Sequence, residues 1–381
     1  MTESRWRVPL ADPVVDDELI EAAREAVASG WWSMGPRVNA FEEAFAELTG
    51  AGHAIAVANG TAALHLALLA VECGPGDEVV LPSLNFVAAA NAILHTGAKP
   101  VFCDIHGDAD LNLDPEDIEP AVTPATKAIL ALHYGGFACD MDAVNGLASK
   151  HGLRVVEDAA HAPGGTYHGA ACGTLGEIGC FSFFSNKNLP VGEGGMIVTN
   201  DDELAAQLRL LRSHGMTTLT WDRHRGHAHS YDVVAQGFNY RLDELRAAMG
   251  IVQLSRLSDE NAGRRKISAA YRERLHGQHG LTMPFDDDEA QRSSSHHLAV
   301  VLLPEGAPRD EVRTALQEAR IQTSVHYPPI HQFSLYAELG ARRPLPRTEG
   351  VAGRLVTLPL YGHMGDEEVD AVVETLVGTL T

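Results

Sequence analysis

The chain has 381 residues, 45% of them hydrophobic and 21% charged, which is ordinary for a globular protein and leaves room for two domains with substantial cores. Its formal net charge of −22 argues against nonspecific binding to nucleic acid or to an anionic membrane, because both need a positive protein surface. A local basic pocket for a phosphorylated ligand is still compatible with this charge.

The five cysteines are widely spaced and form no CxxC motif. This pattern favours buried thiols in a reducing compartment over a disulfide framework or a zinc site, and we expect no bound metal. The N-terminus lacks the apolar segment of a signal peptide, and no stretch reaches about 18 apolar residues. We therefore expect a cytoplasmic protein that makes no use of a membrane.

Helices are predicted first, at residues 15–29 and 37–49, from apolar residues at helical spacing. Short apolar strands then alternate with helices. The strands are expected at residues 54–58, 78–81, 100–104, 128–133, 153–157, 180–185 and 196–199. The intervening helices are expected at residues 61–73, 86–96 and 141–151. This alternation predicts an α/β fold with a mostly parallel central sheet sandwiched by helices.

A long helical pattern over about residues 241–276 links this part to a smaller C-terminal α/β domain. There, strands are predicted at residues 298–303 and 322–325 and helices at residues 309–320 and 366–380. Residues 284–295, rich in Asp and Ser, are predicted to form an exposed loop. We expect a large domain over residues 1–250 and a small domain over residues 251–381.

Lys187 is the most informative single residue. Only five of the 29 Lys and Arg residues are lysine, and this one follows an apolar, strand-like run and precedes a glycine-rich turn. An amine that must attack a carbonyl cannot be replaced by arginine, because guanidinium stays charged and forms no Schiff base. Taken alone, Lys187 is more simply explained as a surface lysine on a hairpin.

Three further segments each combine a functional and a structural interpretation. Gly60 and Thr61 end a strand and open a helix, where free amides can hold a phosphate, although Thr61 is also an ordinary helix cap. Asp158 ends another apolar strand, where it can pair with a protonated ring nitrogen or cap a following helix. His161 could be a satisfied buried imidazole, and Phe86 either a stacking ring or a core residue.

Taken together, these residues have one chemical meaning. A phosphate cradle, a stacking ring, an acid for a ring nitrogen and a lysine able to form a Schiff base are what pyridoxal 5′-phosphate (PLP) needs from a protein. The sequence therefore predicts a PLP site at the carboxyl edge of the sheet.

The chain resembles the DegT/DnrJ/EryC1/StrS sugar aminotransferases, which adopt the fold-type I aminotransferase architecture. The resemblance extends over nearly the whole chain and rests on the Lys187-Asn188 pair and on motifs at residues 30–36, 59–68, 74–79, 157–162, 237–241, 325–328 and 358–360. These motifs are specific for the family and much less specific for a substrate.

The resemblance implies a role for each residue near the cofactor ring. Lys187 would form the Schiff base, Asp158 would bind the pyridine nitrogen, and Phe86 would stack on the ring. His161 would lie on the side of the ring hydroxyl and completes the catalytic set. Some relatives carry histidine at the lysine position and dehydrate sugars instead, and Lys187 argues against that chemistry here.

The resemblance also assigns residues to the phosphate and to the substrate. The phosphate would be held by residues of the helix start and a neighbouring strand, namely Gly60, Thr61, Ala62 and Ser182. Asn239 would reach it from the neighbouring subunit, because sites in this family form across a dimer interface. The residues expected towards the substrate are Trp32, His326 and Tyr327.

The implied function is transfer of an amino group from L-glutamate or L-glutamine to a keto sugar, linked to a nucleotide, in the biosynthesis of an amino sugar. Alternatives are a keto-cyclitol acceptor, a PLP-dependent sugar dehydratase on the same fold, and a noncatalytic PLP-binding regulator. Residues 221–229 are the one dense basic stretch, so Arg223 or Arg225 is a candidate for contacting substrate phosphates, unless this stretch is only a surface loop.

Overall fold

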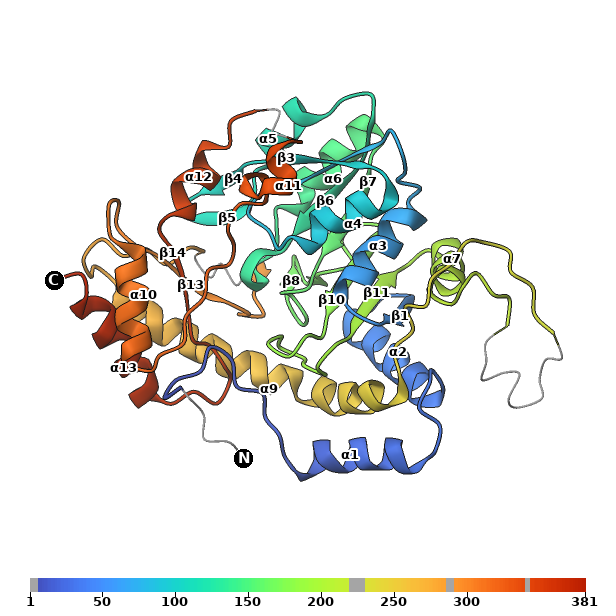
Figure 1. Ribbon diagram of the computed structural model, residues 1–381, viewed down its shortest axis with the longest axis horizontal. Coiled ribbons are helices and arrows are strands. Elements are labelled where there is room, and N and C mark those ends of the chain that lie inside the picture. The colour runs from blue at the N-terminus through green and yellow to red at the C-terminus, as the bar shows by residue number, and fades with distance from the viewer. Residues whose placement is uncertain (1–5, 219–229, 286–290, 340–342) are drawn as a thin grey trace.

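The computed structural model describes residues 6–218, 230–285, 291–339 and 343–381. Seven short strands form its central sheet (Figure 1). In chain order they are β1 (His53–Val57), β2 (Glu78–Pro82), β3 (Lys99–Cys103), β6 (Thr126–Leu132), β7 (Arg154–Asp158), β10 (Ile178–Ser182) and β11 (Gly195–Thr199).

The sheet has the order β1-β11-β10-β7-β6-β2-β3, and every neighbouring pair is parallel except the two pairs that include β11. The predicted mostly parallel sheet is thus confirmed. Its register places Asp158 beside Cys180 of β10 and beside Leu132 of β6. Asp158 therefore ends a central strand, with its side chain at the carboxyl edge of the sheet.

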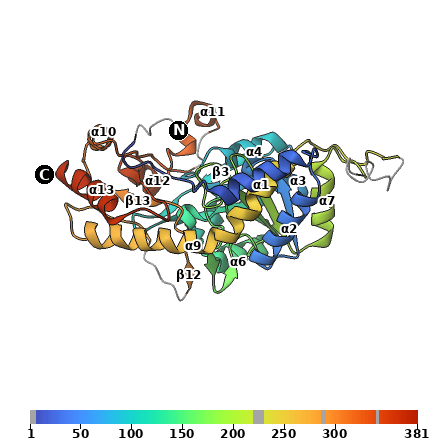
Figure 2. The ribbon, with the colours of Figure 1, turned by 90° about the horizontal axis from the view of Figure 1, so that it is seen from below.

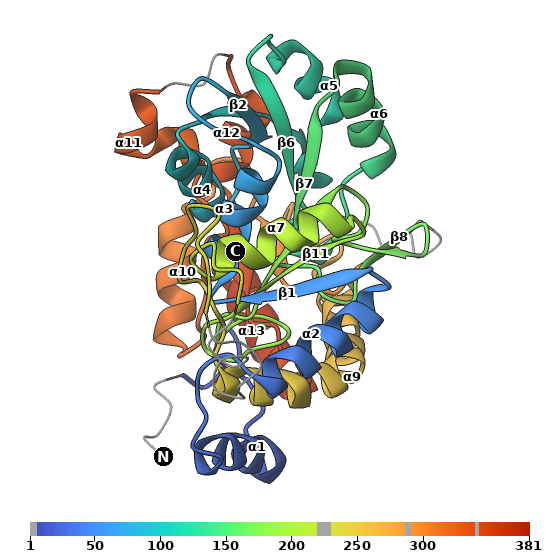
Figure 3. The same ribbon diagram turned by 90° about the vertical axis from the view of Figure 1, so that its right-hand side faces the viewer.

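Helices cover both faces of the sheet, which is why its strands read as continuous apolar runs. In β6, Ala128 and Leu130 pack on one face with α3 (Gly60–Ala70), α4 (Ala88–Thr96) and α7 (Asp202–Arg212). Ile129 and Ala131 alternate with them and pack on the other face with α2 (Pro36–Thr49) and α6 (Met141–His151). Figure 3 shows α3 and α4 on one side of β6 and β7, with α6 on the other.

The long helix α9 (Glu244–Leu275) connects the two parts of the molecule. Asp243 precedes the helix and caps it, because its carboxylate accepts the Arg246 amide. The helix runs from the side of α1 (Asp17–Ala28) and α2 to α13 (Asp366–Gly378) (Figure 2). Leu257 packs into the core of the large sheet, whereas Tyr271 packs into a separate C-terminal core.

The C-terminal core is built on a two-stranded antiparallel sheet of β13 (Ala299–Leu302) and β14 (Leu355–Leu358). The helices α10 (Arg309–Glu318) and α13 cover it, and Val8 joins the same core from the N-terminal segment. We propose that residues 1–250 and 251–381 act as the two domains, with residues around Val8 crossing to the smaller one.

Two predicted segments are wrong. Residues 322–325 form no regular strand; they make a single isolated bridge, that of Ser324 with Thr357. Of the predicted exposed loop 284–295, residues 286–290 lie outside the described part. Ser294 and Ser295 are buried, and Arg292–Ser293 forms strand β12. A serine run can be buried because its hydroxyls are satisfied by backbone groups: the Ser295 hydroxyl donates to the His161 carbonyl.

The remaining short elements connect these layers. They are β4 (Ile105–Gly107), β5 (Asp110–Leu113), α5 (Pro115–Ile118), η1 (Glu119–Ala121), η2 (Tyr134–Gly136), β8 (Thr166–Tyr167), β9 (Ala170–Ala171), η3 (Ile330–Gln332), α11 (Ser334–Ala337) and α12 (Pro346–Ala352). All five cysteines are buried free thiols, as predicted. Within the described ranges, no helix combines the length and apolar character that crossing a bilayer needs.

Candidate active site

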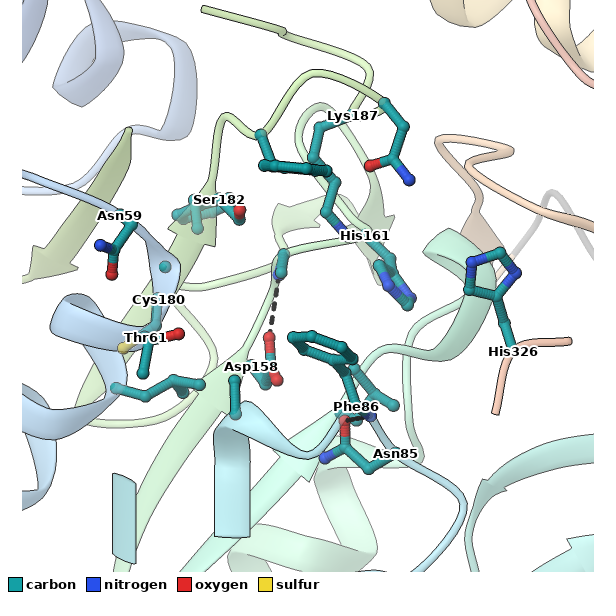
Figure 4. A pocket seen from close by; sticks show the side chains of 18 of the residues that line it. Asn59, Thr61, Asn85, Phe86, Asp158, His161, Cys180, Ser182, Lys187 and His326 are labelled. Atoms are coloured by element: carbon teal, nitrogen blue, oxygen red, sulfur yellow. Dashed lines mark hydrogen bonds between the residues drawn. The ribbon is translucent and has the colours of Figure 1, made fainter. Parts of the chain in front are cut away.

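A cavity of about 390 Å³ opens at the carboxyl edge of the central sheet. The predicted site residues that line it come from separate parts of the chain and are Gly60, Thr61, Phe86, Asp158, His161, Ser182, Lys187, His326 and Tyr327. Figure 4 shows Thr61 and Ser182 on one side of this space and His161 and His326 on the other, with Asp158 and Phe86 between them. The fold thus brings together residues that are up to 267 positions apart in the sequence.

Lys187 lies in the turn that follows β10 and returns the chain to β11. Its backbone amide donates to the Phe184 carbonyl, and its amine Nζ lies 3.4 Å from Nε2 of His297. Burial lowers the pKa of the Lys187 amine to about 8, and the nearby Asp158 carboxylate opposes this fall. Roughly a tenth of the amine is therefore neutral at pH 7, far more than for an ordinary lysine, and only this neutral form can act as a nucleophile or base. The interpretation of Lys187 as a surface lysine is wrong.

Asp158 is 5% exposed, and burial raises the pKa of its carboxyl group. Its Oδ1 accepts the Ala160 amide at 3.2 Å, and this bond, Lys187 and His133 favour the ionised form. Residues 159–165 form turns, so Asp158 does not cap a helix. A buried carboxylate of this kind calls for a cation in the cavity that it lines.

His161 is a neutral imidazole with both ring nitrogens occupied. Its Nδ1 accepts the Gly135 amide at 3.2 Å, so the proton is on Nε2, which donates to the Tyr327 hydroxyl at 2.8 Å. Burial, together with the positive charge of Lys187, holds the pKa of His161 well below its usual range. It is thus a satisfied buried histidine that also lines the cavity, and its two interpretations are compatible.

The start of α3 provides free hydrogen-bond donors. Asn59, not Thr61, caps this helix: its side-chain oxygen accepts the Ala62 amide at 2.8 Å and its carbonyl accepts the Ala63 amide at 3.1 Å. The amides of Gly60 and Thr61 have no partner within the described residues, and they lie at the positive end of the helix, where an anion binds favourably. Because this cap uses the Ala62 amide, the role in phosphate binding that the resemblance implies for Ala62 stays a prediction.

Gly60 is required where α3 approaches β10. A Cβ at this position would lie 2.8 Å from Cβ of Ser182, which is closer than side chains pack. The missing side chain therefore lets the hydroxyl groups of Ser182 and Thr61 share one end of the cavity with the free amides. Both hydroxyls can donate to an anion.

Phe86 is 54% exposed, so it is not the core residue that an isolated phenylalanine usually is. Its ring lies 5.7 Å from that of Tyr327, with an interplanar angle of 46°. An apolar ring held at the cavity wall can stack against a flat heterocycle.

The other predicted site residues lie elsewhere. Asn239 is exposed and pairs through its backbone with Ser213, and Trp32 is 62% exposed, with its indole nitrogen donating to the Val27 carbonyl. Neither is among the residues that line the cavity. Arg223 and Arg225 lie outside the described residues.

Two site features were missed by sequence reasoning. Asn85 lines the cavity and is 1% exposed, and its side-chain NH₂ has no partner among the described residues. His297 contacts Lys187 from a segment 110 positions away in the sequence. Asn85 could have been suspected, because it precedes Phe86 at the end of a strand. His297 carries no local signal.

The residues present fit PLP. The free amides and hydroxyls at one end of the cavity suit its phosphate, the buried Asp158 suits a protonated ring nitrogen, and Lys187 suits its aldehyde. The orphaned donor of Asn85 requires an acceptor, which a polar ligand in this cavity would supply.

Comparison with known proteins gives a consistent result. The family model of the DegT/DnrJ/EryC1/StrS aminotransferase family matches residues 13–377. The spore coat polysaccharide biosynthesis protein SpsC of Bacillus subtilis is 43% identical over 376 residues, which cover 97% of this chain and 96% of SpsC.

Solved structures agree with this assignment. The aminotransferase TlmJ from Streptoalloteichus hindustanus has a TM-score of 0.90 at 36% identity, covering 98% of each chain. The PLP form of the putative sugar aminotransferase Spr1654 from Streptococcus pneumoniae has a TM-score of 0.91 at 28% identity, again covering 98% of each chain. The protein therefore belongs to the DegT/DnrJ/EryC1/StrS aminotransferase family and is a PLP-dependent aminotransferase.

Proposed function

We propose that this protein transfers an amino group from L-glutamate or L-glutamine to a nucleotide-linked keto sugar, in the biosynthesis of an amino sugar. The observation that carries the proposal is the partly buried Lys187 amine facing the same cavity as the buried Asp158 carboxylate. The names of SpsC, a spore coat polysaccharide biosynthesis protein, and of Spr1654, a putative sugar aminotransferase, support a sugar acceptor.

In this proposal, Lys187 and Asp158 divide the proton chemistry. PLP, when bound, supplies a ring that takes up the electrons released at the α-carbon of the amino donor. Asp158 would keep the ring nitrogen protonated. The positive charge of that nitrogen would in turn offset the free-energy cost of burying the Asp158 carboxylate. When its amine is not bonded to PLP, Lys187 would move the proton at the reacting carbon. A pKa of about 8 is well matched to this proton transfer.

His161 and Phe86 position the ring. His161 cannot serve as a strong acid while both its nitrogens are engaged, so we assign it to orientation from the side of the ring hydroxyl. Phe86 would stack on one face of the cofactor ring. The Nε2 proton of His161 is donated to the Tyr327 hydroxyl. This hydrogen bond fixes the His161 imidazole relative to the segment that carries His326.

The phosphate is assigned to the start of α3. The free amides of Gly60 and Thr61 and the hydroxyls of Thr61 and Ser182 supply the donors, and Ala62 contributes only by holding the Asn59 cap in place. We further propose that Asn239 of a second copy reaches this phosphate. In that arrangement the enzyme is a homodimer with shared active sites. We also propose that it works in the cytoplasm.

The substrate side is assigned to His326 and Tyr327 at the cavity and to Trp32 at the protein surface. Burial lowers the pKa of His326 to about 4, so it is neutral at pH 7, and its Nδ1 bonds the Thr357 hydroxyl at 2.9 Å. A neutral histidine suits recognition of sugar hydroxyls. Arg223 and Arg225 remain candidates for contacting nucleotide phosphates.

The test is a substrate screen. The PLP-loaded protein is treated with L-glutamate or L-glutamine, desalted, and offered keto sugars, nucleotide-linked keto sugars and keto cyclitols, with products identified by mass spectrometry. We expect an amino sugar from a nucleotide-linked ketone. An aminated cyclitol alone, a deoxygenated sugar, or no product from any ketone would each contradict the proposal.

Two lysine variants make the screen specific. Lys187→Ala should abolish amination and should leave the fold intact. Lys266→Ala removes an exposed lysine on α9 and should leave turnover unchanged. Turnover that survives in Lys187→Ala would remove Lys187 from the mechanism.

A further inference from the structure

A chain of hydrogen bonds runs from the Lys187 amine into the protein interior. Nζ of Lys187 lies 3.4 Å from Nε2 of His297, and Nδ1 of His297 lies 2.9 Å from Oδ1 of Asn188. The Asn188 amide nitrogen then donates to Oδ1 of Asn261 at 2.8 Å. His297, Asn188 and Asn261 are 5%, 4% and 9% exposed, so the chain is shielded from water.

The donors and acceptors in this chain of hydrogen bonds follow one fixed direction. Asn261 on α9 donates from its amide nitrogen to the Pro163 carbonyl, which can only accept, so its oxygen faces Asn188. Asn188 donates to that oxygen and to the Ser295 carbonyl, both at 2.8 Å, so its own oxygen faces His297. The proton of His297 is therefore on Nδ1, and the Nε2 lone pair points towards Lys187.

We propose that His297 is a positioning residue for Lys187, whose imidazole presents Nε2 as a fixed acceptor that holds the free amine in place for proton transfer. The inference rests on the proposed function, because it presupposes that Lys187 is the base. His297 is not among the residues that line the main cavity, so it acts through Lys187 rather than on a substrate.

A neutral acceptor suits this position better than a charged one. The lysine side chain is long and flexible, and without an acceptor its amine is not confined to one place. A carboxylate there would attract the positive charge and favour the ammonium form, whereas burial keeps the pKa of His297 well below its usual range. His161 packs against His297 with ring centres 4.5 Å apart, which restrains the imidazole from its other side.

Several other ionisable groups surround Lys187. From the cavity side they are Asp158, His161, Cys180, Glu193, His326 and Tyr327. Behind the 186–190 segment they are Asp12, Glu260 and Arg264. Among the cavity groups, His161 and His326 have lowered pKa values and Tyr327 a raised one, so these three are uncharged at pH 7.

Two matched substitutions separate positioning from packing. In His297→Asn, the shorter side chain can still donate to Asn188 but cannot place an acceptor at the Nε2 position. In His297→Gln, the longer side chain can place its oxygen there. We expect His297→Asn to lower kcat by about 100-fold, with KM for the amino donor changed less than about threefold, because small misplacement of a reacting group has effects of this size. His297→Gln should stay within about tenfold of the wild type.

A second measurement needs no bound PLP. Acetylation of Lys187 in the apoprotein, followed by peptide mass spectrometry across a pH series, gives the titration midpoint of its amine, with exposed Lys266 as an internal control. We expect a wild-type midpoint near 8. In His297→Asn the midpoint should fall by roughly one pKa unit, because the ammonium ion loses more hydrogen-bond energy than the amine does. His297→Gln should restore it.

The outcomes are distinct. Equal losses of kcat in the two variants, or wild-type values of both kcat and the Lys187 midpoint in His297→Asn, would overturn the positioning role. If either variant fails to fold, Asn261→Leu replaces it in the test, because this substitution removes the acceptor of the Asn188 amide. It should lower kcat by about tenfold with KM unchanged. An unchanged kcat in Asn261→Leu would equally contradict the positioning role. Turnover retained in Lys187→Ala would instead overturn the proposed function.

Discussion

The cost of burying the Lys187 amine can be measured in the apoprotein by comparing the wild type with Lys187→Met. Methionine is close to lysine in length and carries no charge. In the folded wild type, burial disfavours the ammonium form of Lys187. In the unfolded chain the amine is solvated, and the ammonium form is not disfavoured. We therefore expect Lys187→Met to be the more stable protein at pH 7, and its advantage to decrease as the pH rises.

The magnitude follows from the lowering of the pKa from its ordinary value of 10.5 to about 8. At about 1.4 kcal/mol for each pKa unit, the difference is at most about 3 kcal/mol, because part of the side chain remains in contact with solvent. Between about pH 8 and pH 10.5, the unfolded lysine carries a proton that the folded lysine lacks, so the wild type gains stability over this range. Below about pH 8 that gain is lost.

The assay is urea unfolding of the two apoproteins at equal concentration, from pH 7 to pH 10.5, followed by circular dichroism. Groups common to both proteins cancel in the difference, and equal concentration removes the effect of any subunit association. The free-energy difference should shrink across the range by an amount that does not exceed about 3 kcal/mol. A difference that stays constant with pH would show that the amine is not buried, and the assignment of Lys187 as a neutral base would fail.

Three further predictions concern the cavity. Asp158→Asn should lower kcat by about 10²- to 10³-fold in steady-state assays, because the amide cannot hold a proton on the ring nitrogen; a loss below about threefold would contradict the assigned role. Gly60→Ala should weaken PLP binding in equilibrium dialysis, because its Cβ would lie 2.8 Å from Cβ of Ser182, and unchanged affinity would refute that constraint. Tyr327→Phe should destabilise the apoprotein by about 1–3 kcal/mol in urea unfolding, since it leaves the Nε2 proton of His161 unpaired.

The sequence was sufficient to predict the chemistry of the cavity because the relevant residues lie at strand ends. Asp158 and Lys187 each follow an apolar strand, and parallel strands bring their carboxyl ends to one edge of the sheet. The same logic placed Gly60 and Phe86 there. The details of α3 were less predictable, since either Asn59 or Thr61 is a suitable cap, and only the backbone geometry decides that Asn59 takes this role.

What the sequence could not reveal depends on contacts between distant segments. His297 meets Lys187 only because residues 295–297 and α9 pack against Lys187 and Asn188, and no local pattern marks such a contact. The buried serines at 294 and 295 were misjudged for the same reason, because polar residues appear exposed until their partners are known. The proposed role of Asn239 requires a second copy of the protein, whose position the sequence of one chain does not give.

The most direct test of the account is to trap the bond between PLP and the protein. The PLP-loaded enzyme is reduced with borohydride and digested, and the peptide that carries the added cofactor mass is sequenced by mass spectrometry. We predict that the cofactor is attached at Lys187 and that no labelled peptide is recovered from Lys187→Ala. Attachment at Lys99, Lys127, Lys150 or Lys266 instead would contradict the account.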